Sequence, residues 1–243
     1  PFGSVTVGLR GTKAFVVTNS GGAASTLGTV TTADIGLASP FILDGGTCGT
    51  GSVLSASGGS CTLVVDFAPA ASGAANDAID LAYSNGLTDA GASRAVTGTG
   101  LSPAALTWSN SPLYDFGTVI AGGASSASLT VTNSGETAAT LGTVSAGALG
   151  LAAPFDFDGG TCATGAVLAA DGGSCTVAVV FAPTDAGATN DSVDLAYSTG
   201  VADASASRAV QGTVVWPGLL AISDEPFGSV TVGLRGTKAF VVT

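Results

Sequence analysis

The chain has 243 residues, of which 46% are hydrophobic and only 9% are charged, with 17 acidic residues against 6 basic ones. So few Lys and Arg side chains cannot neutralise a row of phosphates, which argues against nucleic acid and against an anionic membrane surface as partners. No run of about 18 apolar residues is present, so we expect no direct membrane insertion in this part of the chain.

Repeats dominate the sequence, at a long period and at a shorter one. Residues 1–18 return unchanged as residues 226–243, so we interpret the chain as one unit of a longer tandem array and the beginning of the next. Inside this unit, residues 2–99 align without a gap on residues 116–213, and most of the aligned residues are identical. The unit therefore contains two copies of one module.

Both modules contain the alternating patterns that are typical of β-strands. Every second residue is apolar from Cys61 to Phe67, and the matching segment from Cys175 to Phe181 repeats this pattern. Turn sequences such as Asn-Ser-Gly, Asp-Gly-Gly and Ala-Pro separate these segments, and no segment keeps a helical period of about 3.6 residues. About seven short strands per module predict an all-β chain of tandem seven-stranded immunoglobulin-like antiparallel β-sandwiches.

The repeats also predict the domain boundaries. We expect a first immunoglobulin-like module over residues 1–100 and a second over residues 116–213, with joints over residues 101–115 and 214–225. Residues 226–243 hold only the first strands of the next unit, which is too little to be stable alone.

The two predicted joints contain proline and carry large aromatic residues. Trp108 and Tyr114 lie in the first joint, and Trp216 lies in the second, directly before Pro217. A bulky aromatic residue in a short, proline-stiffened joint favours modules that pack end to end. Alternatively, each Trp covers the core of its own module. The sequence leaves both interpretations open.

The four cysteines form two pairs at equal spacing, Cys48 with Cys61 and Cys162 with Cys175. Four cysteines allow three pairings, but each module has to fold with its own pair, so we predict one disulfide within each module. A disulfide that closes so small a loop stabilises the fold by about 3 kcal/mol. It also indicates an oxidising compartment, which places the protein outside the cell or at the cell surface. A zinc or redox site is disfavoured, because the sequence has no Cys-x-x-Cys motif and no histidine.

Candidate catalytic and metal-binding residues are few. Without histidine, a Ser-His-Asp or Cys-His arrangement is impossible, and no Gly-x-Ser-x-Gly motif is present. Asp77 and Asp80, repeated as Asp191 and Asp194, could act as paired carboxylates, but strand-surface and turn positions explain them better. Asn76-Asp77, Asn190-Asp191 and the two Asp-Gly-Gly turns offer oxygen ligands for calcium, but ordinary turns explain them better. We therefore predict a protein that is not an enzyme, with no catalytic residue, no metal and no cofactor.

The module surfaces are expected to carry little charge. Arg94 and Arg208 are the only basic residues kept in both modules, and each is expected to pair with an exposed acidic neighbour on its sheet. Other outward positions are small and neutral, as at Ser128, Thr130 and Thr132. Neutral, flat faces suit lateral packing of modules.

Four short motifs resemble a known family. They are Phe-Gly-x-Val near the start of each module, Val-Thr-Asn-Ser-Gly on the next strand, Ser-Cys-Thr before a strand that ends in Phe-Ala-Pro, and a closing Val-x-Gly-Thr. This order resembles the bacterial choice-of-anchor D repeats, which are similar to the ASPM/SPD-2/Hydin group of immunoglobulin-like domains. The resemblance implies a seven-stranded sandwich used in exported, surface-attached multidomain proteins, and the family has no shared catalytic residues.

These observations lead to one functional hypothesis and one alternative. The hypothesis is a structural repeat unit of an extracellular bacterial fibre, filament or stalk, with one disulfide per module and with copies of itself as partners. In the alternative, the modules form the stalk of a cell-surface adhesin whose binding tip lies outside these residues.

Overall fold

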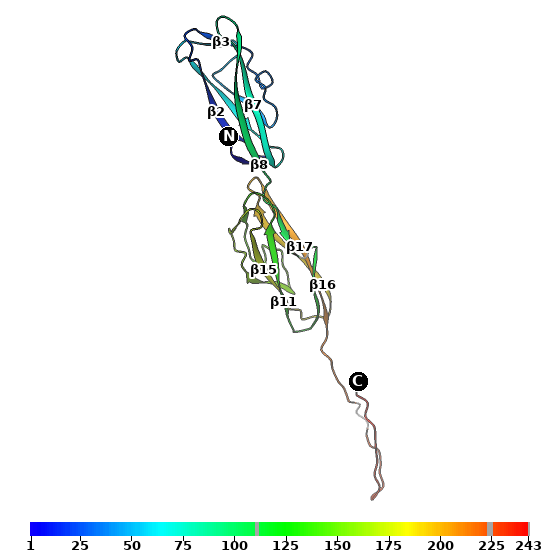
Figure 1. The fold of residues 1–243 in the computed structure, drawn as a ribbon. Coiled ribbons are helices and arrows are strands. Elements are labelled where there is room, and N and C mark those ends of the chain that lie inside the picture. Colours follow the sequence, from blue (N-terminus) through cyan, green and yellow to red (C-terminus); the bar gives the residue numbers. More distant parts are fainter. Residues whose placement is uncertain (110–111, 223–225, 243) are drawn as a thin grey trace.

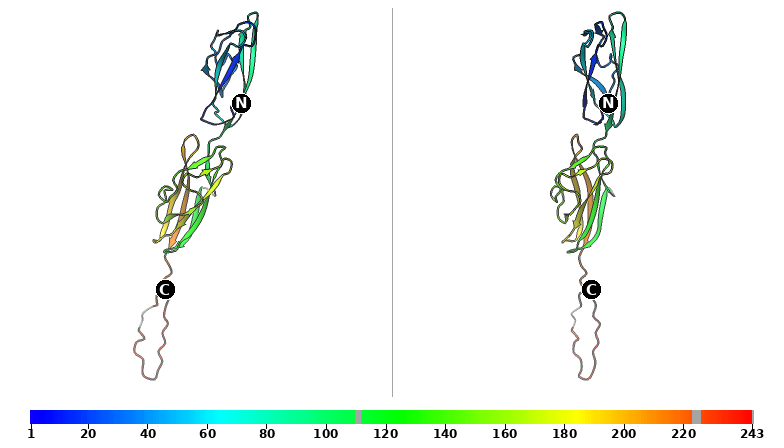
Figure 2. Two further views of the ribbon diagram at one scale, coloured as in Figure 1. Left: turned by 90° about the vertical axis from the view of Figure 1, so that its left-hand side faces the viewer. Right: turned by 60° about the vertical axis from the view of Figure 1, so that its left-hand side comes forward.

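A computed structural model describes residues 1–109, 112–222 and 226–242. It contains two β-sandwich modules arranged end to end, followed by an extended C-terminal segment (Figure 1). Two further views agree that the modules and this segment follow one another along a line (Figure 2). The described residues form no helix that is long and apolar enough to cross a membrane.

The first module is built from two facing sheets. One sheet has the strand order β1-β8-β7-β3-β5, and the other has the order β2-β6-β4. Neighbouring strands are antiparallel except for β1 and β8, which run parallel. The strands are β1 (Ser4–Thr6), β2 (Gly11–Thr18), β3 (Ser25–Leu27), β4 (Phe41–Gly46), β5 (Val53–Leu54), β6 (Ser60–Phe67), β7 (Gly73–Ser84) and β8 (Asp89–Leu101).

The second module repeats this plan with one additional strand. Its sheets have the orders β10-β17-β16-β12-β14 and β13-β15-β11-β9, and β9 is the additional edge strand beside β11. The strands are β9 (Leu106–Trp108), β10 (Leu113–Ile120), β11 (Ser125–Asn133), β12 (Ala139–Leu141), β13 (Phe155–Gly160), β14 (Val167–Leu168), β15 (Ser174–Phe181), β16 (Gly187–Ser198) and β17 (Asp203–Val215). The prediction of an all-β chain with two tandem immunoglobulin-like sandwiches is confirmed, with eight strands in the first module and nine in the second where about seven were expected.

Aromatic rings fill the same place in both cores. In the first module, Phe41 stacks on Phe67 with ring centroids 5.0 Å apart, and Phe155 and Phe181 do the same in the second module at 4.8 Å. Fully burying a ring of this size contributes about 1.5–3 kcal/mol. Gly212 lies under the Phe181 ring, where an added Cβ would clash with the ring atoms. The ring stack thus requires glycine on the facing strand.

The structure corrects the predicted first joint over residues 101–115. Strand β9 and the start of β10 lie inside this range, and both belong to the second sandwich. The physical reason is that Leu106 and Trp108 alternate onto the inner face of β9, where they are buried, and Trp108 is only 7% exposed. Of the two interpretations of Trp108, the structure therefore favours a core residue of its own module.

Candidate functional site

The disulfides connect the same two points of each module. Cys48 bonds to Cys61 and Cys162 to Cys175, each with an Sγ–Sγ distance of 1.97 Å and a Cα–Cα distance of 5.0 Å. All four residues are buried in the two cores, and no described cysteine is free. Each bond ties the loop after β4 or β13 to the start of the central strand, β6 or β15. The bonds are placed to stabilise the modules and indicate an oxidising, exported environment.

The candidate carboxylates Asp77 and Asp191 accept hydrogen bonds from backbone amides. Asp77 Oδ2 accepts a hydrogen bond from the Ala38 amide at 2.8 Å, and Asp191 Oδ2 accepts the equivalent bond from Ala152 at 2.8 Å. Each bond holds the loop that leads into β4 or β13. In the part of the chain that the structure describes, no three His, Cys, Asp or Glu side chains gather in a way that could hold a metal ion.

The structure also corrects the expected environment of Arg208. Its side chain is only 1% exposed, because it shares the inward face of β17 with Ala206 and Val210, whereas Asp194 lies on a neighbouring, outward position. The guanidinium lies 5.6 Å from the centre of the half-buried Tyr114 ring, which is a favourable cation–π geometry. Burial lowers the pKa of Arg208, and Tyr114 acts in the opposite direction. The matching Arg94 of the first module is exposed.

Direct contacts fix the first module on the second. Ser102, which directly follows β8, donates its backbone N–H to Glu136 Oε2 at 2.7 Å, and its hydroxyl accepts a bond from the Glu136 amide at 3.2 Å. Thr137 Oγ1 donates to the Ser102 carbonyl at 2.9 Å and lies 3.3 Å from Thr6 Oγ1 of the first module. The turn after β11 thus binds the chain where it leaves the first module, which limits rotation of one module relative to the other.

An asparagine anchors the additional strand β9, and sequence reasoning missed this role. Asn133 is fully buried, and its Nδ2 donates to the carbonyls of Thr137, Leu168 and Ala169. Its Oδ1 accepts from the amide of Ala105, the residue before β9, at 3.1 Å. The sequence offered a signal, because Asn133 belongs to the Thr-Asn-Ser-Gly motif shared by both modules, but a turn explained that motif equally well.

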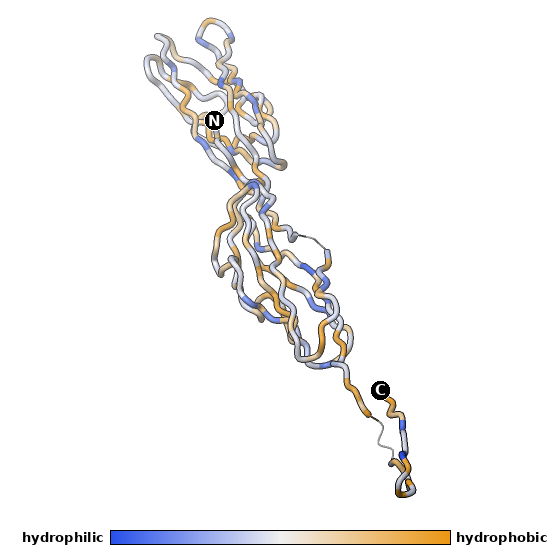
Figure 3. The backbone as a smooth tube through the Cα atoms, turned by 60° about the horizontal axis from the view of Figure 1, so that its bottom comes forward, coloured by the Kyte–Doolittle hydropathy of each residue, from blue (hydrophilic) through white to orange (hydrophobic). Residues whose placement is uncertain are grey.

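Trp216 lies outside both cores. It follows β17 and is 64% exposed, in contrast to Trp108. Leu219, Leu220 and Ile222 next to it are also largely exposed. Figure 3 shows this apolar stretch where the chain leaves the second module. Four large apolar side chains in one short, exposed segment are unusual for a soluble protein and indicate a contact surface.

Comparisons with known proteins match one family of domains. Residues 108–213 match the HYDIN/CFA65/VesB-like, Ig-like domain family. Among solved structures, the VesB protease of Vibrio cholerae has 24% identity and a TM-score of 0.38 over 44% of this chain, which spans 31% of the VesB chain.

Two further solved structures are similar at lower identity. PapD-like domain 7 of human CEP192 has 16% identity and a TM-score of 0.35, over 46% of this chain and 87% of that chain. A mutant of the CFA/I enterotoxigenic E. coli adhesin CfaE has 9% identity and a TM-score of 0.33, over 87% and 97%. No curated protein matches the sequence significantly. The resemblance to the Hydin group is confirmed, since residues 108–213 match the HYDIN/CFA65/VesB-like immunoglobulin-like domain and residues 2–99 repeat the sequence of this module.

Proposed function

We propose that this chain is a structural repeat unit of an extracellular bacterial fibre, filament or stalk, whose partners are copies of itself. One observation carries the proposal: residues 1–18 return without a change as residues 226–243, after two complete modules. An array of identical units gives length and a regular spacing, which a structural element needs and a catalyst does not.

Two features of the modules support this role. Each module has its own buried disulfide, so every module in the array resists unfolding independently. Within a unit, the contacts of Ser102 with Glu136 and Thr137 limit the movement of the second module relative to the first. A chain of such modules transmits force along its length and presents little charge to its neighbours.

Electron microscopy of the native, unproteolysed material tests the proposal. A module of this type is about 35–45 Å long, since strands rise about 3.3 Å per residue. We expect long filaments with an axial repeat of one module or of one two-module unit. Short single rods that end in a distinct head would instead make the modules the stalk of a cell-surface adhesin. Compact particles without an axial repeat would contradict both functions.

A further inference from the structure

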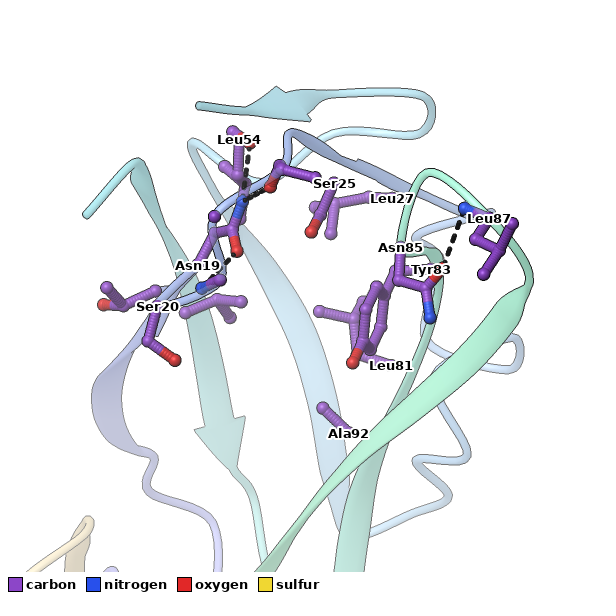
Figure 4. A pocket seen from close by; sticks show the side chains of 15 residues that line it. Asn19, Ser20, Ser25, Leu27, Leu54, Leu81, Tyr83, Asn85, Leu87 and Ala92 are labelled. Atoms are coloured by element: carbon purple, nitrogen blue, oxygen red, sulfur yellow. Dashed lines mark hydrogen bonds between the residues drawn. The ribbon is translucent and has the colours of Figure 1, made fainter. Parts of the chain in front are cut away.

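Among the described residues, no strand of the first module corresponds to the edge strand β9 of the second. In the second module, β9 pairs antiparallel with β11, with Trp108 opposite Val131 and Leu106 opposite Asn133. Strand β2 holds the position of β11, but its sheet ends there, in the order β2-β6-β4. A groove of about 550 Å³ takes the place of β9. In Figure 4, Leu27, Leu81 and Tyr83 line one side of this groove and Asn19 lines the other.

Core residues are uncovered along this groove. Val131, Asn133 and Tyr197 are buried in the second module, whereas their counterparts Val17, Asn19 and Tyr83 are only half-buried. Three further residues on the strands that flank the groove are buried in the second module and less buried in the first. Leu129 is buried and Phe15 is half-buried, whereas Ala206 and Arg208 are buried and their counterparts Ala92 and Arg94 are exposed. A groove whose walls are core residues in the sister module is suited to an apolar strand.

A glycine in the groove points to the same kind of occupant. Gly135 lies two residues after Asn133. A Cβ added to Gly135 would clash with the carbonyl of Pro103, where the chain enters β9. Gly21 occupies the matching position, but a Cβ there would meet only Asn19 Oδ1, at 3.2 Å. Glycine at position 21 is therefore required only when a chain segment approaches as Pro103 does.

The chain itself contains a segment of matching sequence. Residues 215–222 continue the alignment of the two modules onto residues 101–108, with Pro217 for Pro103, Leu220 for Leu106 and Ile222 for Trp108. In the second module Leu106 and Trp108 are buried, whereas Leu220 is 78% exposed and Ile222 is 68% exposed. The segment thus has the apolar residues of β9 without a core to receive them.

One pairing already has the required register. Ile222 forms an isolated antiparallel bridge with Val242. Val242 belongs to the repeated copy of residues 1–18 and is the counterpart of Val17, which in turn matches Val131. The bridge therefore reproduces the pairing of Trp108 with Val131 at the next joint of the array.

We propose that residues 216–222 of a second copy of this chain fill the groove of the first module as its missing edge strand. Ile222 then lies opposite Val17 and Leu220 lies opposite Asn19. The Leu220 amide donates to the Tyr83 hydroxyl, as the Leu106 amide does to Tyr197 Oη at 3.3 Å. In the proposed array this second copy is the preceding unit, which has the same sequence, so the inference rests on the proposed function and gives each joint between units a buried contact.

Peptide binding to the full chain tests the inference without the need for fibres. The probe is a fluorescein-labelled peptide with the sequence of residues 215–222, and fluorescence anisotropy measures its binding. We expect saturable binding, and we expect the peptide with Leu220→Asp to bind at least about tenfold more weakly, because a carboxylate would enter the apolar groove. This comparison leaves the protein unchanged, so misfolding cannot produce the difference.

Two variants of the chain locate the binding site. Gly21→Val should weaken binding by about tenfold or more, because its side chain occupies the path of Pro217. Gly22→Ala is the matched control and should bind normally, since no atom lies within 4 Å of its added Cβ and Glu136 holds the matching position. Equal binding of the two peptides, or no binding up to about 1 mM peptide, would overturn the proposal.

The two proposals fail in different ways. Binding of the peptide by a protein that forms no filaments would retain the groove as a strand-binding site and reject the fibre. Filaments formed by a protein that does not bind the peptide would retain the fibre and reject the filling of the groove by residues 216–222. Hydrogen exchange adds a second measurement, in which the peptide should slow exchange along β2.

Discussion

Replacing Gly212 with Ala tests how closely the second core is packed. The added Cβ would lie 2.7 Å from Phe181 Cζ and 2.8 Å from Phe181 Cδ1, well inside van der Waals contact. The ring cannot withdraw freely, because it stacks on Phe155 at 4.8 Å and lies 5.8 Å from Phe116. Overpacking of this kind costs about 1–3 kcal/mol.

The unfolded chain partly offsets this cost. Replacing Gly by Ala reduces the entropy of the unfolded state and stabilises by about 0.4–1 kcal/mol where the folded backbone tolerates it. We therefore expect a net destabilisation of about 1–2 kcal/mol. In urea this corresponds to a midpoint lower by about 1 M, for a slope of about 1–3 kcal/mol per molar denaturant.

Urea unfolding followed by tryptophan fluorescence measures the effect. In a Trp216→Phe background, the buried Trp108 is the single tryptophan and reports on the second module. Gly147→Ala is the matched control, because its Cβ would meet no atom within 4 Å and Ala33 holds the same place in the first module.

A double variant separates the ring clash from other effects. Adding Phe181→Leu removes the ring, so the pair should cost less than the sum of the single substitutions. The reasoning would be refuted by a Gly212→Ala variant as stable as Gly147→Ala, or by strict additivity in the double variant.

Three further predictions follow from the site. Reduction of the disulfides should lower the free energy of unfolding of each module by about 3 kcal/mol, measured by urea titration with and without dithiothreitol. Hydrogen bonds from Gln211 and the Gly117 amide lower the pKa of Asp115 below its ordinary value of 3.8. The stabilisation that accompanies this shift is present above pH 3.8 and is lost as the pH falls through the lower pKa of the folded state. Gln211→Ala should raise the pKa of Asp115, which an NMR titration measures. Glu136→Ala removes the carboxylate that accepts from the Ser102 amide, and small-angle X-ray scattering should then report a wider spread of angles between the modules.

The sequence predicts the sandwich well because its signals are local. Alternation from Cys175 to Phe181 depends on the period of a strand alone, and β15 spans that segment. Turn sequences and the cysteine spacing are equally local. The environment of Arg208 is different, because its guanidinium lies over the ring of Tyr114, which is far away in the sequence. Charged residues are rarely buried, so a pattern-based reading places this side chain at the surface.

The joint could not be assigned from the sequence for a related physical reason. Residues 101–115 diverge from residues 214–225, and divergence of this kind usually marks a linker. Strand β9 has only three residues, Leu106–Trp108, and such a short segment gives no readable period. The pairing with β11 shows that it belongs to a sheet, and the Leu106 amide also donates to the hydroxyl of Tyr197 on the facing sheet.

Because β9 belongs to the second sandwich, the boundaries of the folded domain differ from the boundaries of the sequence repeat. The repeat within the unit begins at Phe116, but the second sandwich already includes Trp108, where the match to the Ig-like domain family also begins. The second domain thus takes its edge strand from the joint before it and its remaining strands from the repeated residues. Applied to residues 226–242, the same rule assigns residues 216–222 to the domain that follows them, and the bridge between Ile222 and Val242 has the register that this assignment requires.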